Sequence, residues 1–385
     1  MTADITKIRL RQVWTIARIE LSRAFFSKRA LWVYILAGIP ALIFGYHAVN
    51  LTIREHRYSG RGVTPAQTLA TIPKGASVEE ALRIAPNPVD ENRWHSRRFK
   101  VGKKEHAPRA EGSEQVDENR DEERDREDVE ARLLTYYDGT QLTVLRFENG
   151  KLQGSRSHQF KDFPQDRLVY AGIFQFFYLR LAVFFGCLGI FMNLFRGEML
   201  DKTLHYWFLT PVRREVLLAG KYLAGLIAAV VIFGGGAVLS YAAMLWPQNG
   251  VELQAFWAAA GLNHMVWYTA AAMLGCLGYG SVFLASGLLL RNPIVPAVVI
   301  LVWESVNGFL PALLQKLSVL YYLQSICPEA APVDNGAPAL IRLLLAPAAP
   351  ASHLVAVLGL LAVTALVLWA ASRAVLRVEI DYGTE

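Results

Sequence analysis

Cysteine is scarce in this chain of 385 residues, and the three that occur are not paired at the spacing of a metal site. Two of them, Cys187 and Cys276, lie inside apolar runs, so a disulfide framework is not supported. The sequence also lacks the HExxH and CxxC metal motifs and the GxxxxGK phosphate loop. The glycine cluster Gly234–Gly236 has no lysine after it and indicates close helix packing. We therefore expect no catalytic set, bound metal or cofactor in this chain.

Charge is also scarce over long stretches of the sequence. Hydrophobic residues make up 53% of the chain, and they gather in long runs on either side of one very polar block. This distribution is typical of a membrane protein with a soluble insert. The first run, residues 31–50, is too long for a signal-peptide core and no small-residue cleavage site follows it, so we expect a retained span.

The apolar runs predict an α-helical polytopic membrane protein with six transmembrane helices. Each run is long enough to cross the hydrocarbon layer of a bilayer. The fourth run is longer than one crossing needs, and the sequence leaves open whether it crosses once or is re-entrant. The predicted spans are residues 31–50, 168–195, 216–246, 256–290, 294–314 and 352–373, with a tail at 374–385.

Residues 1–30 are basic and amphipathic, which predicts an N-terminal helix lying in the headgroup layer. A soluble helix packed on a partner is the alternative. The basic pair Lys28–Arg29, directly before the first span, favours membrane anchoring. The predicted apolar face consists of Leu10, Val13, Trp14, Ala17, Leu21, Ala24 and Phe25.

The polar block at residues 51–165 is predicted to be an α+β insert in which acidic and basic residues balance. Ser77 and Glu80 form a capping box, which predicts the start of a short helix. The run 100–132 is predicted to be a charged linker, because it contains little that could form a core. Nothing in the block has the spacing of a catalytic set, so substrate or partner binding and a simple cap are equally open. Residues 133–162 are predicted to be β-rich, with hairpin turns at Asp138–Gly139 and Asn149–Gly150.

Basic residues near the span ends predict the orientation of the chain. Most basic residues outside the polar block fall on the side that holds the N-terminus, the loop after the second span and the C-terminal tail. Both termini are therefore expected in the cytoplasm. The same rule places residues 51–165 and the loop 315–351 on the opposite side of the membrane.

Residues 196–215, between the second and third predicted spans, have the features of a short helix followed by a turn. Glu198 and Asp201 stand near its start, where carboxylates favour a helix N-terminus. Thr210 as N-cap and Pro211 at the first helical position then predict the start of a new helix. The short helix carries an apolar stripe of Leu200, Leu204, Trp207 and Phe208. The basic residues expected at the headgroups are Arg213, Arg214 and Lys221.

In this order, Glu198, Thr203–Leu204, Thr210–Pro211–Val212, Arg213–Arg214 and Lys221 resemble the pattern of the type-2 ABC exporter permeases. The six-span plan is similar too, and the large block after the first span resembles the subgroup with an extracytoplasmic insert there. The resemblance implies a non-catalytic permease subunit of a bacterial plasma membrane. It also implies a segment coupled to an ATPase, made of Glu198, Asp201, Lys202, Thr203, Leu204, Thr210, Pro211, Arg213 and Arg214.

The same resemblance implies the partners of the chain. Two copies of a separate ATPase subunit would hold the ATP and Mg, and a second permease copy or a paralogue would complete the membrane part. No nucleic-acid partner is expected. ATP-driven closure of the ATPase pair would move the short helix and reorient the spans. The alternative for residues 196–215 is an ordinary charged loop that contacts headgroups, and the resemblance does not give the substrate.

Three polar residues lie within predicted spans, where an ionisable group costs about 2.5–3.5 kcal/mol on insertion scales. Arg180 lies in the second span, and Glu304 and Asn307 lie in the fifth. They are expected either to line a substrate path or to pair and hold the spans together. His264 is expected to form a hydrogen bond between helices.

Three other functions compete with a permease. A receptor or scaffold acting through the 51–165 block would leave residues 198–221 without a role. A membrane enzyme on lipid-linked substrates would need acids or histidines clustered near one membrane face, which the sequence does not show. A secondary transporter would be expected to show a repeat between its halves, and none is found.

The orientation makes a direct prediction. A cysteine introduced into residues 51–165 should react with a membrane-impermeant maleimide in intact cells, because the basic-residue bias places this block outside. Labelling that occurs only after permeabilisation would reverse the orientation.

Overall fold

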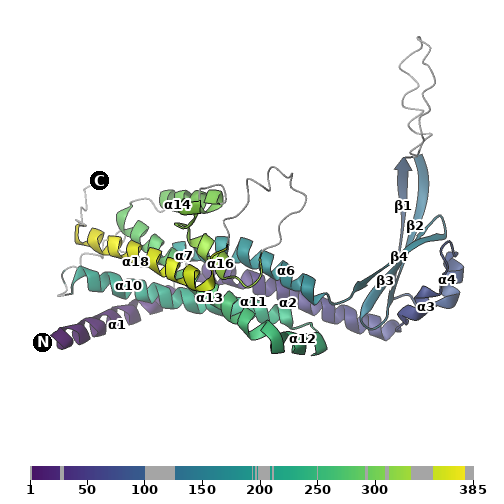
Figure 1. The fold of residues 1–385 in the computed structure, drawn as a ribbon, viewed down its shortest axis with the longest axis horizontal. Helices are drawn as coiled ribbons and strands as arrows, with labels where there is room; N and C mark the ends of the chain where they lie inside the picture. The colour runs from purple at the N-terminus through teal and green to yellow at the C-terminus, as the bar shows by residue number, and fades with distance from the viewer. Residues whose placement is uncertain are drawn as a thin grey trace, which may run out of the picture. The chain divides into compact units, whose positions relative to one another are not determined.

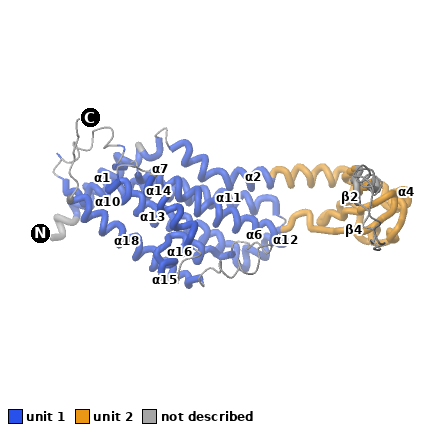
Figure 2. The backbone as a smooth tube through the Cα atoms, turned by 90° about the horizontal axis from the view of Figure 1, so that it is seen from above, with its two compact units in different colours: residues 1–48, 163–385 blue, residues 49–162 orange. Residues whose placement is uncertain are grey.

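The computed structural model describes residues 2–26, 30–99, 126–192, 194–195, 197, 209, 212–248, 250–290, 294–307, 312–330 and 350–377. The chain divides into two compact units, shown in different colours in Figure 2. The first unit, hereafter the helical unit, comprises Met1–Ala48 and Phe163–Glu385. The second, hereafter the sheet unit, is Val49–Asp162.

The chain is mostly helical and is an integral multi-pass membrane protein, as the apolar runs predict. Among the described residues, five helices are long and apolar enough to cross a membrane. Within the helical unit they lie alongside one another, and the first of them continues past Ala48 into the sheet unit (Figure 1 and Figure 2). Their bounds are Ala30–Arg61, Phe163–Phe191, Arg214–Leu245, Gly250–Leu289 and His353–Leu376.

Three of these long helices contain wider π-helical turns. α6 (Phe163–Ile173) continues as η1 (Phe174–Val183) and α7 (Phe184–Phe191). α10 (Arg214–Ala229) continues as η2 (Val230–Gly234) and α11 (Gly235–Leu245). The fourth long helix consists of α12 (Gly250–Phe256), η3 (Trp257–Gly261) and α13 (Leu262–Leu289). α2 is Ala30–Arg61 and α18 is His353–Arg377.

The fourth apolar run forms one continuous helix of 40 residues, Gly250–Leu289. This helix does not fold back on itself. At 1.5 Å per residue this helix is about 60 Å long, roughly twice the thickness of the hydrocarbon layer. The helix continues through its glycines, and neighbouring side chains pack closely beside them. A Cβ on Gly280, for example, would meet the ring of Phe191.

The region predicted as a fifth span and an extracytoplasmic loop is built differently. The helix α14, Ile294–Val306, has 13 residues, and the short helices α15 (Ala312–Gln315) and α16 (Val319–Ile326) follow it. The predicted loop 315–351 contains the short helix α16, whose apolar residues are buried in the core of the helical unit. Burial is favoured because α16 presents apolar side chains to α13 and α18 alike.

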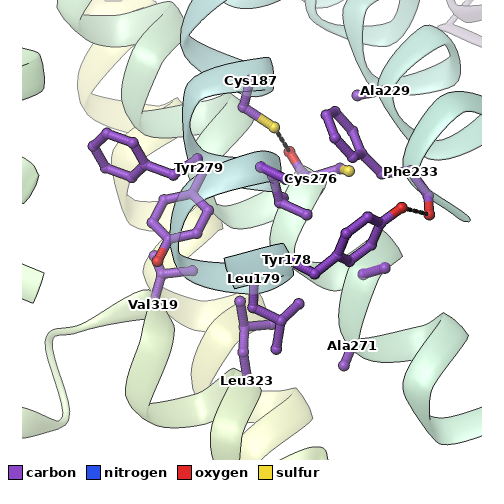
Figure 3. Close-up of a cluster of buried hydrophobic side chains, with 14 of the residues drawn as sticks. Tyr178, Leu179, Cys187, Ala229, Phe233, Ala271, Cys276, Tyr279, Val319 and Leu323 are labelled. Atoms are coloured by element: carbon purple, nitrogen blue, oxygen red, sulfur yellow. Dashed lines mark hydrogen bonds between the residues drawn. The ribbon is translucent and has the colours of Figure 1, made fainter. Parts of the chain in front are cut away.

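The core of the helical unit combines aromatic packing with close helix approach. The Tyr178 hydroxyl donates to the Phe233 carbonyl at 2.6 Å, and the Cys187 thiol faces the Cys276 carbonyl at 3.9 Å (Figure 3). A Cβ on Gly236 would lie 2.7 Å from the Ala37 carbonyl oxygen, so only glycine allows this approach of α11 to α2. The prediction of close packing at this glycine is confirmed.

The sheet unit contains a four-stranded antiparallel sheet in the order β1–β2–β3–β4. Its buried core places Leu134, Leu145 and Phe147 against the helices α3 and α4. The capping box is confirmed, because the Ser77 hydroxyl accepts the Glu80 N–H at 3.1 Å and α4 begins at the next residue. The bounds are α3 Ala66–Ala70, α4 Val78–Ile84, β1 Asp90–Phe99, β2 Arg126–Tyr137, β3 Gln141–Glu148 and β4 Lys151–Gln159.

Both predicted hairpin turns are confirmed, and the predicted linker is not confirmed in full. Gly139 and the Asn149–Gly150 pair adopt positive φ at the tips of the two hairpins. Residues 126–132, assigned to the charged linker, instead form the start of β2 and pair with β1. The charges there are partly matched across strands, since Arg132 binds Glu91 at 2.8 Å. Residues 100–125 lie outside the described residues.

The first hairpin turn is stabilised by the Asp138 carboxylate. It accepts the N–H groups of Gln141 and Thr140, the latter at 2.8 Å, and the Thr140 hydroxyl at 3.0 Å. Burial alone would raise the pKa of Asp138, but these hydrogen bonds lower it below its ordinary value. A carboxyl with a lowered pKa stabilises the fold above its unfolded pKa, and this contribution disappears as the pH falls through the folded pKa.

We therefore predict that Asp138→Ala lowers the stability of the β2–β3 hairpin by about 1 kcal/mol at neutral pH. Hydrogen-exchange protection factors for residues 130–148 in the full chain measure the effect. In the wild type, protection should fall between pH 7 and the acidic range, whereas Asp138→Asn, which keeps an acceptor oxygen without the charge, should flatten that dependence. An equal pH dependence in both proteins would contradict the assignment.

Candidate functional site

The N-terminal helix α1, Thr2–Phe26, packs along α10 within the helical unit. Ile16 contacts Val216 and Leu217 in a small buried cluster. Glycine at position 220 permits the approach, because a Cβ there would lie 2.7 Å from the Cβ of Ile16. The buried face differs from the predicted stripe: Leu10 and Trp14 are 63% and 58% exposed.

Glu20, one turn after Ile16, explains why α1 turns this face to α10. Its carboxylate binds the Lys221 ammonium of α10 at 2.8 Å, and both side chains are buried. Lys221 also donates to the Leu194 carbonyl at 2.9 Å and lies 5.4 Å from the centre of the Phe195 ring. We call Glu20, Lys221, Leu194 and Phe195 the lysine node.

The expectation that Lys221 contacts lipid headgroups is therefore wrong. Its side chain is fully enclosed by protein, with 0% exposed. A buried ammonium needs a paired charge and further acceptors, because leaving water costs several kcal/mol. Glu20 supplies the charge, and the carbonyl of Leu194, three residues after the second long helix ends, supplies an acceptor.

The lysine node lies at both ends of the segment that the sequence singles out. Leu194 and Phe195 directly precede residue 196, and α10, which carries Lys221, begins directly after residue 213. The predicted coupling residues Glu198, Asp201, Lys202, Thr203, Leu204, Thr210 and Pro211, and the anchoring pair Lys28 and Arg29, lie outside the described residues.

Of the predicted coupling residues, the two that the structure describes take different roles. Arg213 is the N-cap of α10, with extended backbone, and its carbonyl accepts the N–H of Val216 at 2.9 Å. α10 therefore starts at Arg214, which corrects the predicted start at Pro211. The Arg214 guanidinium donates to the carbonyls of Val375 and Leu376 at the end of α18, at 3.3 and 3.4 Å. Cations are favourable at such a helix C-terminus.

The intramembrane group of Arg180, Glu304 and Asn307 is partly brought together. The Glu304 carboxylate accepts the Ser318 hydroxyl and the N–H groups of Val319 and Leu320, at 3.1 and 3.3 Å for the latter two. It thereby caps the N-terminus of α16. Arg180 donates at 3.5 Å to the backbone carbonyl of Glu304, not to its carboxylate.

These contacts favour a structural role for Glu304. A carboxylate with three donors at a helix N-terminus is satisfied where it stands. The Asn307 side-chain oxygen and Arg180 Nε are buried and have no hydrogen-bond partner among the described residues. No three His, Cys, Asp or Glu side chains gather as a metal site within the part of the chain that is described.

Comparison with protein-family models, curated proteins and solved structures finds no match for this chain. Function must therefore be argued from the geometry of the sites themselves.

The sequence contained one signal for the lysine node that periodicity overlooked. Glu20 lies four residues after Ile16 and three after Ala17, so all three share a helical face. An acid on an otherwise apolar face indicates a buried partner. The sequence does not identify Lys221 as that partner, because the two residues are 201 positions apart.

We predict that Glu20→Met and Lys221→Met each destabilise the protein by about 3–5 kcal/mol, because each leaves one buried charge without its partner. The double variant should recover most of the loss, since two apolar side chains of similar length replace the pair. Thermal unfolding of the purified protein in detergent measures all three, with the exposed Glu252→Gln as control. Additive losses in the double variant would show that the two charges are not coupled.

Proposed function

We propose that this chain is the permease subunit of an ATP-driven exporter of the type-2 ABC class, coupled to a separate ATPase through residues 196–213. The observation that carries the proposal is the lysine node. It ties α1 to α10 through Glu20 and Lys221, and it ties α10 to Leu194, which lies three residues beyond the end of α7 and directly before that segment.

The node gives the segment a mechanical role that an ordinary loop would not need. A displacement applied to residues 196–213 reaches Phe195 on one side and Arg213 on the other. Because Lys221 binds both Leu194 and Glu20, the second and third long helices would move together with α1. An interaction with two discrete arrangements, paired or broken, is the kind of element that transmits coupling.

Arg214 extends this connection to the last membrane helix. Its guanidinium contacts the final turn of α18, and α10 and α18 also pack against each other. The flank of the segment is thus joined to the second, third and last long helices. This arrangement supports a segment whose movement would displace the membrane helices, which a simple connecting loop would not do.

The proposal includes six membrane crossings with both termini in the cytoplasm of a bacterial plasma membrane. α14 alone spans about 20 Å, short of the roughly 30 Å hydrocarbon layer. α14 and α16 together supply enough length for the fifth crossing, and the Glu304 carboxylate joins them. The sheet unit would then lie outside the cell.

The partners follow from the same proposal. Two ATPase subunits, which supply ATP and Mg, would each bind one permease segment, and a second copy of this chain or a paralogue would form the other half. The substrate path would run within the pair or between its halves.

We predict that Glu198→Ala and the double substitution Thr210→Ala/Pro211→Ala abolish co-purification with the ATPase subunit that the proposal requires, co-expressed with this chain. These residues belong to the surface that the ATPase groove would hold. Glu252→Gln, at an exposed acid of α12, is the matched control and should retain the ATPase. Unchanged capture by the segment variants would contradict the docking assignment.

A second prediction separates docking from coupling. The double variant Glu20→Met/Lys221→Met should remain folded and bind the ATPase, yet lose most of the substrate-stimulated ATP hydrolysis, because the node no longer transmits movement between α1 and α10. Steady-state hydrolysis in nanodiscs measures this. Wild-type stimulation in the double variant would assign the node to stability alone.

A further inference from the structure

A second polar cluster lies in the helical unit, toward the far ends of the second and third long helices from the lysine node. Arg167 of α6 donates through its guanidinium to the carboxylate of Glu329, which follows α16. His264 of α13 places Nδ1 3.8 Å from the same carboxylate oxygen. Gln175 of η1 donates to the Glu329 backbone carbonyl at 2.6 Å. The ion pair is only partly buried, with 29% of the Arg167 side chain and 15% of the Glu329 side chain exposed.

Aromatic rings surround the cluster. The Tyr268 ring lies 5.0 Å from Tyr170 and 5.9 Å from Tyr241, measured between ring centres. The Arg167 guanidinium lies 4.7 Å from the centre of the Phe256 ring. Such rings offer apolar surface beside a cation and a few polar contacts, which is the composition of many small-molecule sites.

Three donors in this cluster have no partner among the described residues. They are the hydroxyls of Tyr241 and Tyr268 and the Nε of Arg167, all buried. Tyr241 and Tyr268 are each only 2% exposed. A buried donor without an acceptor costs about 1–3 kcal/mol, so three at one place are unusual in a native protein. The Tyr170 hydroxyl, by contrast, has Ser240 as a partner at 3.2 Å.

The unpaired donors face one internal space. Tyr241, Tyr268 and Arg167 line it, together with Tyr170, Met244, His264 and Glu329. With Glu329 paired to Arg167, the space has no room even for a water-sized molecule. A ligand that fits must therefore bring acceptor atoms and compete with Glu329 for Arg167.

An acidic group meets both requirements. A phosphate or carboxylate would take the position of the Glu329 carboxylate on Arg167 and accept the two tyrosine hydroxyls as well. One anion replaces another, so Arg167 stays paired, and the displaced Glu329 still has His264 beside it. The rings of Phe163, Phe256 and Tyr170 would cover an apolar body attached to the acid.

We propose that the Arg167–Tyr241–Tyr268 cluster is a binding site for the acidic head of an amphiphile, with Glu329 as the internal group that the ligand displaces. The identification of this amphiphile as the exported substrate rests on the proposed function. The binding itself does not, since it requires neither an ATPase nor ATP.

The test uses the full chain purified in dodecyl maltoside, with octyl phosphate as the probe. Binding is followed by thermal shift and by isothermal titration calorimetry. Octyl phosphate should bind saturably and raise the melting temperature. Octyl glucoside and octyltrimethylammonium, which share the tail but not the acid, should not. Inorganic phosphate, which lacks the tail, should bind far more weakly, and equal binding would assign the site to the free anion.

Substitutions distinguish ligand binding from a structural ion pair. Arg167→Gln should weaken octyl phosphate binding roughly tenfold or more, because it removes the charge-assisted hydrogen bonds. Glu329→Gln should tighten binding, because the internal competitor loses its charge. If both substitutions weaken binding alike, or if octyl glucoside gives the same shift as octyl phosphate, the proposal is overturned.

The tyrosines supply a test that does not depend on breaking the ion pair. Tyr241→Phe/Tyr268→Phe removes two hydroxyls that have no partner, so the protein should stay as stable as the wild type, yet bind octyl phosphate several-fold more weakly. Tyr279→Phe is the matched control, because its hydroxyl is equally buried and unpaired but does not line this space. Should Arg167→Gln fail to fold, unchanged binding in the double tyrosine variant would overturn the proposal.

Discussion

The contact on which the membrane part depends most is the buried ion pair between Glu20 and Lys221. Two charges out of water are tolerated only as a pair with further hydrogen bonds, so this contact fixes the face that α1 turns to α10. It also positions Leu194, three residues beyond the end of α7, through the carbonyl that accepts from Lys221. The three elements that border residues 196–213 therefore cannot be repositioned one at a time.

The two polar clusters of the bundle follow opposite physical rules. The lysine node is closed: the ammonium and the carboxylate are satisfied by each other and by a carbonyl oxygen. The cluster at Arg167 leaves three buried donors that have no acceptor in the described part of the chain. A satisfied cluster makes a rigid joint, whereas an unsatisfied one retains free energy that a ligand can recover. Rigidity and binding are thus separated within one bundle.

Elements whose formation depends on nearby residues could be predicted from the sequence. Long apolar runs predict the membrane helices, Ser77 and Glu80 predict the start of α4, and the two glycine turns predict both hairpins. Contacts between residues far apart in the sequence were not predicted. The strand β2 starts among charged residues because β1 pairs with it, and α16 is buried because α13 and α18 cover it. Arg167 and Glu329, 162 residues apart, carry no mutual signal in the sequence.

The long helices and α14 differ in length, so the thickness of the surrounding bilayer affects them differently. The helix Gly250–Leu289, about 60 Å long, exceeds any ordinary bilayer and can change its tilt at little cost. α14, about 20 Å long, has no such reserve. A thicker membrane would therefore act on α14 and on the carboxylate that joins it to α16, while the long helix absorbs the change. Membrane thickness becomes a physical variable to which one part of this protein responds and another does not.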